Sequence, residues 1–174
     1  DYALMRSFPN MQILSPGNNN ELIALFNYIQ KNPQPSYLRL DKTEHKEVEF
    51  KKIAVFPGGI VKLIDGNKKK ILLTTGSIQS IAKNIKLKKY KNHSLYSMPI
   101  WGMKAKNKVK NIIKKFDEII TIEDHFYDGG FGSWLKECIN DTNIKTKIIS
   151  KYIRPEIINE VGTREYLLEK YGPK

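Results

Sequence analysis

The chain has 174 residues, of which 40% are hydrophobic, so it is long enough and apolar enough to bury a core and is not a disordered tract. The formal net charge is +12 and comes mainly from lysine, without arginines or aromatic residues interleaved in the lysine runs. Sequence-specific nucleic-acid readout favours arginine and aromatic side chains, so we expect no specific nucleic-acid partner. Solvated loops account for the lysine runs, with a polyanion site as the alternative.

Membrane and secretory signals are absent from the sequence pattern. No uncharged apolar run approaches the roughly 18 residues of a membrane span, and the first residues do not form a signal peptide. The single cysteine, Cys138, cannot form an internal disulfide and falls on the apolar face of a predicted helix, so a buried thiol is expected. We therefore expect a cytoplasmic protein that does not contact a membrane.

The first 44 residues predict a strand, a helix and a second strand. Residues 11–14 form a short apolar run that predicts a buried strand. Residues 21–31 follow possible asparagine N-caps and have apolar side chains at i, i+3, i+4 and i+7, as on one face of a helix. Two prolines end this helix, and residues 36–40 predict the second strand. The unit is too small to fold alone, and the charged residues 45–52 are interpreted as a linker to a second domain at 53–174.

The second domain alternates strands with helices. An Asp-Gly turn at 65–66 separates apolar runs at 59–64 and 70–75, which predicts an antiparallel hairpin. Later helices are expected near residues 78–85, 105–116, 131–138 and 163–171, and later strands near 93–98, 118–122 and 144–150. This alternation is typical of an α/β fold with a mostly parallel five-stranded sheet, one antiparallel edge strand and helices on both faces.

Polar residues follow the predicted strand 118–122, at the sheet edge where open α/β folds gather functional groups. Glu123 and His125 would share one side of an extended segment, with Asp124 on the other. A carboxylate beside a histidine could serve acid–base chemistry, but a structural network or subunit contact is the favoured interpretation. The glycines at 129–132 favour close strand–helix packing over phosphate binding, because their spacing matches no phosphate-binding loop. His45 and His93 have no ligand partners at metal-binding spacing, so no metal site is predicted.

Two cations lie at the end of the predicted strand 36–40. Arg39 belongs to the strand, and Lys42 follows just beyond it. Strand ends followed by loops are good positions for phosphate-binding cations, and charge-assisted contacts suit that role. A solvated lysine remains the alternative for Lys42.

Four motifs in this order and spacing resemble the C-terminal part of the transketolase family. They are Arg6-Ser7-Phe8-Pro9-Asn10, Leu73-Thr74-Thr75-Gly76-Ser77, Thr121-Ile122-Glu123-Asp124-His125 and Gly129-Gly130-Phe131-Gly132-Ser133. That family comprises thiamine diphosphate enzymes that move two-carbon ketol units between sugars. The resemblance implies that residues 1–44 are the end of a pyrimidine-binding domain and that residues 53–174 are the C-terminal domain. It covers nearly the whole chain.

The resemblance also implies what the chain lacks. The family's Mg²⁺ and diphosphate site, its cofactor-protonating carboxylate and its aromatic cofactor contacts would lie upstream of Asp1. No catalytic, cofactor-binding or metal-binding residue is therefore expected here. The family's substrate phosphate-binding arginine falls on Lys42, close to Arg39, which makes these two residues the substrate-binding candidates. Lysine keeps the charge but loses the bidentate fork of arginine.

The expected parent is a dimeric transferase acting on sugars, with sugar phosphates favoured. The chain itself would be structural and inactive, and it would need the remainder of the enzyme or a separate N-terminal subunit. One alternative is a part of a deoxyxylulose-phosphate synthase or of a 2-oxoacid dehydrogenase β-subunit. The other is a non-catalytic basic binding module.

Overall fold

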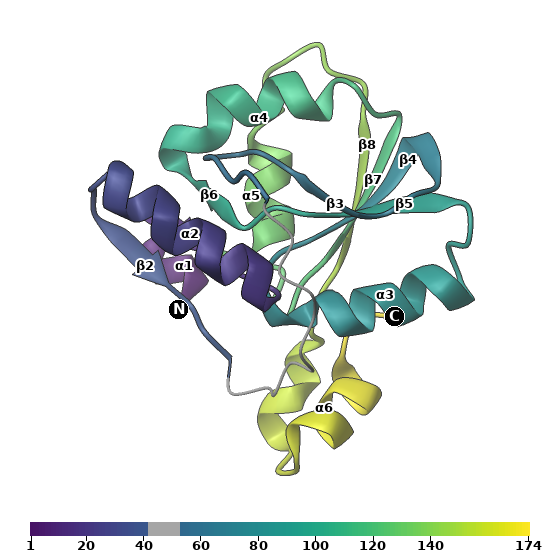
Figure 1. The fold of residues 1–174 in the computed structure, drawn as a ribbon. Coiled ribbons are helices and arrows are strands. Elements are labelled where there is room, and N and C mark those ends of the chain that lie inside the picture. The colour runs from purple at the N-terminus through teal and green to yellow at the C-terminus, as the bar shows by residue number, and fades with distance from the viewer. Residues whose placement is uncertain (42–52) are drawn as a thin grey trace.

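A computed structural model describes residues 1–41 and 53–174 of the chain. Its helices and strands follow one another as Figure 1 shows, with short 3₁₀ helices at 76–78, 103–105 and 155–159. In chain order the elements are α1 (Tyr2–Met5), β1 (Gln12–Leu14), α2 (Asn19–Lys31), β2 (Ser36–Leu38), β3 (Val61–Ile64), β4 (Asn67–Thr74), α3 (Gln79–Lys88), β5 (His93–Ser97), β6 (Ile100–Gly102), α4 (Lys106–Ile113), β7 (Glu118–Ile122), α5 (Phe131–Glu137), β8 (Lys147–Lys151) and α6 (Arg164–Tyr171).

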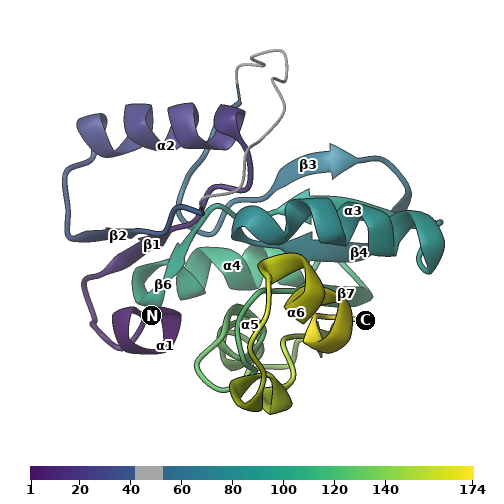
Figure 2. The same ribbon diagram turned by 90° about the horizontal axis from the view of Figure 1, so that it is seen from below.

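The main sheet has five strands in the order β3-β5-β4-β7-β8. Strands β4, β5, β7 and β8 are parallel, and β3 lies antiparallel to β5 at one edge. Helices cover both faces, with α3 on one side and α4 and α5 on the other (Figure 2). This architecture confirms the predicted mostly parallel sheet with one antiparallel edge strand.

The predicted hairpin between residues 59–64 and 70–75 is wrong. The antiparallel neighbour of β3 is β5, which lies between β3 and β4. The Asp-Gly turn crosses the start of β5, where the backbone N–H of Asn67 donates to the carbonyl of Asn92 at 2.5 Å. A side chain at Gly66 would collide with the carbonyl of His93, so glycine permits this close crossing. The Asp-Gly signal therefore predicted the turn correctly but not the pairing of the strands that flank it.

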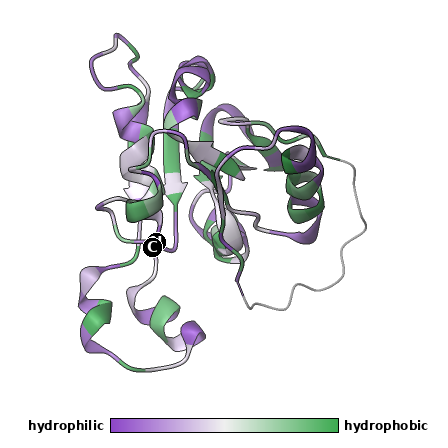
Figure 3. Cartoon of the chain, turned by 90° about the vertical axis from the view of Figure 1, so that its left-hand side faces the viewer, coloured by the Kyte–Doolittle hydropathy of each residue, from purple (hydrophilic) through white to green (hydrophobic). Residues whose placement is uncertain are grey.

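Alternating side chains of the central strands build two cores. Ile71 and Leu73 of β4 face one cluster, which contains Trp134 of α5, while Leu72 faces the other with Ala82 of α3. Figure 3 shows hydrophobic residues in the central strands and hydrophilic residues along the connecting loops. A two-residue period in strands buried on both faces is the pattern expected for this layered fold.

A second sheet joins the beginning of the chain to its later part. Its strands have the order β2-β1-β6, with β1 and β2 parallel and β6 antiparallel to β1. Tyr2 and Ile13 belong to the same buried cluster as Trp101 of β6, and the rings of Tyr2 and Trp101 meet edge to face at 5.1 Å. The two predicted parts therefore share a core within the described residues, while the predicted linker at 45–52 lies outside them.

Candidate functional site

A small polar cleft lies where the main sheet changes direction. Neighbouring strands β4 and β7 leave the sheet toward opposite faces, β4 into α3 and β7 into α5. Ligands in open α/β folds bind at such switch points, beyond the carboxyl ends of the strands. The cleft has a volume of about 100 Å³ and is lined by Ser15, Arg39, Leu40, Asp41, Ser77, Asp124 and Arg164.

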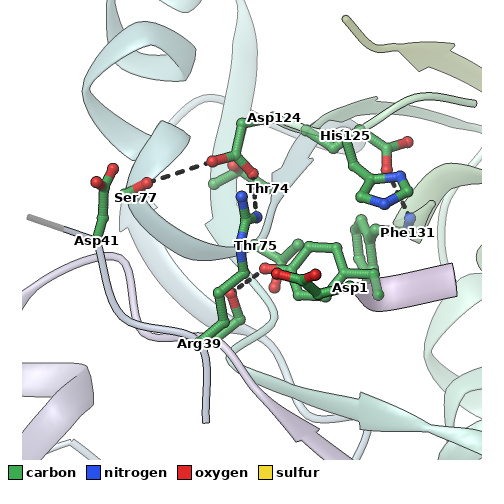
Figure 4. A network of polar contacts seen from close by, with 12 residues as sticks. Asp1, Arg39, Asp41, Thr74, Thr75, Ser77, Asp124, His125 and Phe131 are labelled. Carbon is green, nitrogen blue, oxygen red and sulfur yellow. Dashed lines mark hydrogen bonds and ion pairs between the residues drawn. The ribbon is translucent and has the colours of Figure 1, made fainter. Parts of the chain in front are cut away.

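The charged groups of the cleft form a continuous chain of contacts. Arg39 Nη1 lies 2.6 Å from Asp124 Oδ1, and the Ser77 hydroxyl donates to Asp124 Oδ2 at 3.4 Å (Figure 4). Arg164 continues the chain, with Nη2 at 3.3 Å from Ser77 Oγ and 2.8 Å from Asp41 Oδ2. The contacts join segments that follow β2, β4 and β7 to the start of α6, so the chain of ion pairs ties together parts far apart in sequence.

Tyr2 supports Arg39 from beneath. The Arg39 guanidinium lies 4.6 Å from the centre of the Tyr2 ring, and the Tyr2 hydroxyl bonds to Ser15. Burial raises the pKa of Tyr2 to about 12, so the phenol stays protonated. Burial alone would lower the pKa of Arg39, but the Asp124 carboxylate and the Tyr2 hydroxyl raise it, so the guanidinium stays charged.

Glu123 performs a structural role on the other side of the strand end. Its side chain is fully buried and accepts the backbone N–H groups of Phe131 at 2.5 Å and Gly132 at 2.8 Å. Burial raises its pKa to about 8, against the two N–H donors, which lower it. A side chain at Gly130 or Gly132 would collide with this carboxylate. The glycines therefore permit close strand–helix packing, as the sequence predicted.

The arrangement of the other candidates favours binding over proton transfer. His125 faces away from the two cleft carboxylates, with Nδ1 at 3.0 Å from the Phe126 carbonyl, and burial lowers its pKa. Cys138 is fully buried at the end of α5, where burial raises the pKa of its thiol to about 12. Of the two substrate-binding candidates, Arg39 lies in the cleft, whereas Lys42 falls outside the described residues.

The described residues do not form a metal site or a membrane span. No group of three or more His, Cys, Asp or Glu side chains within 1–41 and 53–174 could hold a metal ion. The cleft carboxylates of Asp41 and Asp124 are both engaged by arginines, so they do not fit a site for Mg²⁺ and a diphosphate. No helix of the described segments is both long and apolar enough to cross a bilayer.

Sequence reasoning missed three members of the cleft, Asp41, Ser77 and Arg164. Ser77 stands within one of the four motifs, but nothing in its neighbours marks it as a contact of Asp124. Arg164 lies in the first turn of α6, and only the fold brings it to Asp41. These contacts connect residues that are distant in the chain, so periodicity and spacing carry no signal for them.

Comparison with known proteins identifies the relatives of the chain. No family model matches it. Over 99% of its length it is 27% identical to a 1-deoxy-D-xylulose-5-phosphate synthase of Clostridium tetani, of which it covers 28%. It is also 26% identical over 99% of its length to a putative transketolase C-terminal section of Methanocaldococcus jannaschii, of which it covers 54%. One of the subunits of an apulose-4-phosphate transketolase of Actinobacillus succinogenes is 29% identical over 80% of the chain and is covered to 45%.

A solved structure shares the fold. It is described as a split-gene transketolase, inactive β4 tetramer, and it matches 99% of the chain with a TM-score of 0.76 and 23% identity, with 56% of its own length covered. The chain thus spans between about a quarter and about a half of the proteins that it matches. With the order of motifs and the observed sheet, these matches show that the chain belongs to the transketolase family and corresponds to the C-terminal part of its members.

Proposed function

We propose that the chain is the C-terminal portion of a thiamine diphosphate-dependent transketolase that transfers a two-carbon ketol unit between sugars. The observation that carries this proposal is the match of 99% of the chain to a transketolase C-terminal section. The match to a transketolase that is divided into subunits supports a parent enzyme made of separate chains. The cofactor and Mg²⁺ would be held by the remainder of the enzyme, because the described residues do not fit a site for them.

Within that enzyme the chain would support structure and dimer contacts and would be inactive alone. The chain of ion pairs and the shared core hold residues 1–41 against the second domain, which suits a rigid support. The division at residues 44 and 53 is part of this proposal, as are the homodimer and the cytoplasmic location. The solved relative described as an inactive β4 tetramer agrees with a protein that is inactive without its partner.

Substrate binding is assigned to Arg39 and Lys42. Arg39 carries a permanent charge and is positioned by Tyr2 and Asp124 at the end of β2. Its side chain keeps 30% of its surface exposed, so an anionic group can reach it. We propose that these two cations favour phosphorylated sugars, through charge-assisted hydrogen bonds.

A reconstitution assay tests the proposal. The chain is combined with the remaining part of its enzyme, thiamine diphosphate and Mg²⁺, and two products are measured in parallel. Transfer of a ketol unit from a ketose phosphate to an aldose phosphate is the expected result. Formation of 1-deoxy-D-xylulose 5-phosphate instead would support the synthase alternative, which the first relative favours. Absence of both activities in a correctly assembled complex would refute the proposed function.

A further inference from the structure

The lysine excess of the chain is concentrated at one edge of the main sheet. The amino ends of the parallel strands β4, β5, β7 and β8 meet at that edge, which lies opposite the polar cleft. The segments that lead into these strands are 65–70, 88–92, 114–118 and 139–147. Together they contain ten lysines and four acidic residues. In Figure 1 the connections from α4 to β7 and from α5 to β8 lie at the top of the sheet, whereas α6 lies at the bottom. We call these four segments the basic edge.

The lysines of the basic edge are available to a ligand. All ten are exposed, and in the described part of the chain only Lys147 among them forms an ion pair, with Glu118 at 3.9 Å. The segments are also tied to one another, since Lys69 Nζ donates to the Lys115 carbonyl at 3.1 Å. A hollow of about 560 Å³ lies between two of the segments, with Lys114 and Lys145 on its walls. The edge therefore presents a fixed row of positive charges rather than scattered ones.

The chemistry of this surface indicates the class of ligand. Stable protein interfaces are depleted in lysine and centre on aromatic or large apolar anchors. Among the exposed large hydrophobic residues of the described chain, only Leu87 lies next to the basic edge. Lysine is a mobile point charge without the bidentate fork of arginine, so it neutralises phosphates without reading bases. These properties fit a polymer of phosphate groups better than an acidic protein surface.

We propose that the basic edge binds the phosphate backbone of single-stranded nucleic acid without sequence preference. A flexible strand can follow lysines that stand on four separate loops, as a rigid surface cannot. Binding would depend on counterion release, so it would be strong at low salt and weak at physiological salt. This role is separate from the proposed transferase function and does not require it.

Two sets of substitutions test the proposal in the full chain. The first replaces Lys68, Lys91, Lys114 and Lys145 at the basic edge by Gln. The second is the matched control and replaces four exposed lysines elsewhere, Lys31, Lys83, Lys104 and Lys174, by Gln. Both variants lose the same net charge, so any difference between them reports position. Circular dichroism confirms that each variant is folded.

Fluorescence anisotropy with labelled oligouridylate and oligothymidylate provides the measurement, over a series of salt concentrations. Each lost phosphate contact lowers the slope of log Kobs against log salt by about 0.7, so the edge variant should lose about 2 to 3 from the slope and roughly tenfold or more in affinity at low salt. The control should keep most of both. Equal losses in the two variants, or no binding by the wild type at low salt, would overturn the proposal. Tighter binding to polyglutamate than to either oligonucleotide would also overturn it and would indicate an acidic protein partner.

Discussion

Replacing Glu123 by Ala should destabilise the protein more than any other single change at the end of β7. The carboxylate is fully buried and accepts the N–H groups of Phe131 and Gly132, the first two residues of α5. A helix of seven residues has little internal stability, so it depends on these contacts. The Ala variant leaves two buried donors without an acceptor.

The magnitude follows from those two donors. Each buried donor left unsatisfied costs about 1–3 kcal/mol, so the total loss is roughly 2–6 kcal/mol. For a domain of this size a loss of about 3 kcal/mol would lower Tm by roughly 6–12 °C. Asp124→Ala is the matched control, because it alters the next residue and removes a partly exposed ion pair with Arg39. Such a pair contributes at most about 1 kcal/mol.

Urea unfolding followed by tryptophan fluorescence measures both variants. Trp134 lies within α5 and Trp101 packs against it with ring centroids 5.2 Å apart, so the signal reports directly on this helix. We expect the loss of unfolding free energy in Glu123→Ala to exceed that in Asp124→Ala by at least about 1 kcal/mol. A Glu123→Ala loss equal to or smaller than the control would refute the view that this carboxylate holds the start of α5.

Three further predictions concern pH, thiol reactivity and the substrate candidates. Because the folded state raises the pKa of Glu123 to about 8, its stabilising contribution should be complete below the ordinary carboxyl pKa and be lost as pH rises through about 8, so wild-type stability should fall relative to Glu123→Gln across that window; parallel pH profiles of the two proteins would contradict this. The Cys138 thiol, buried with a pKa raised to about 12, should not react with a thiol reagent at neutral pH until urea unfolds the chain, and rapid native labelling would show that α5 does not cover it. In the complete enzyme Lys42→Ala should lower kcat/KM for a phosphorylated sugar roughly 10- to 150-fold, with Lys42→Arg as the control that keeps activity. Unchanged kinetics would indicate that Lys42 is not a phosphate contact.

Local signals predicted the elements of this fold, because the information for them is local. The alternating apolar residues of β7 and the periodic apolar face of α2 each lie within one short segment. The cap of α6 was likewise readable, since Thr163 accepts the N–H of Tyr166, three residues later. The resemblance then indicated the sheet into which these elements assemble.

Long-range contacts could not be predicted in the same way. β6 has only three residues and forms because its register with β1 is completed by Trp101, which packs against Tyr2 near the start of the chain. Arg164 reaches the cleft because α6 returns to the carboxyl edge of the sheet, and no spacing marks it. Glu123 was correctly favoured as structural, but its two N–H partners follow from the close approach that Gly132 permits.

Calorimetric titration with thiamine diphosphate and Mg²⁺ tests the central claim most directly. The claim is that this chain is the C-terminal portion of a transketolase whose cofactor site belongs to the remainder of the enzyme. The isolated chain should give no binding heat, whereas the complex with the remainder of the enzyme should bind the cofactor. Binding of the cofactor by the isolated chain with micromolar affinity would contradict the claim, because the described residues do not fit a site for the metal and diphosphate.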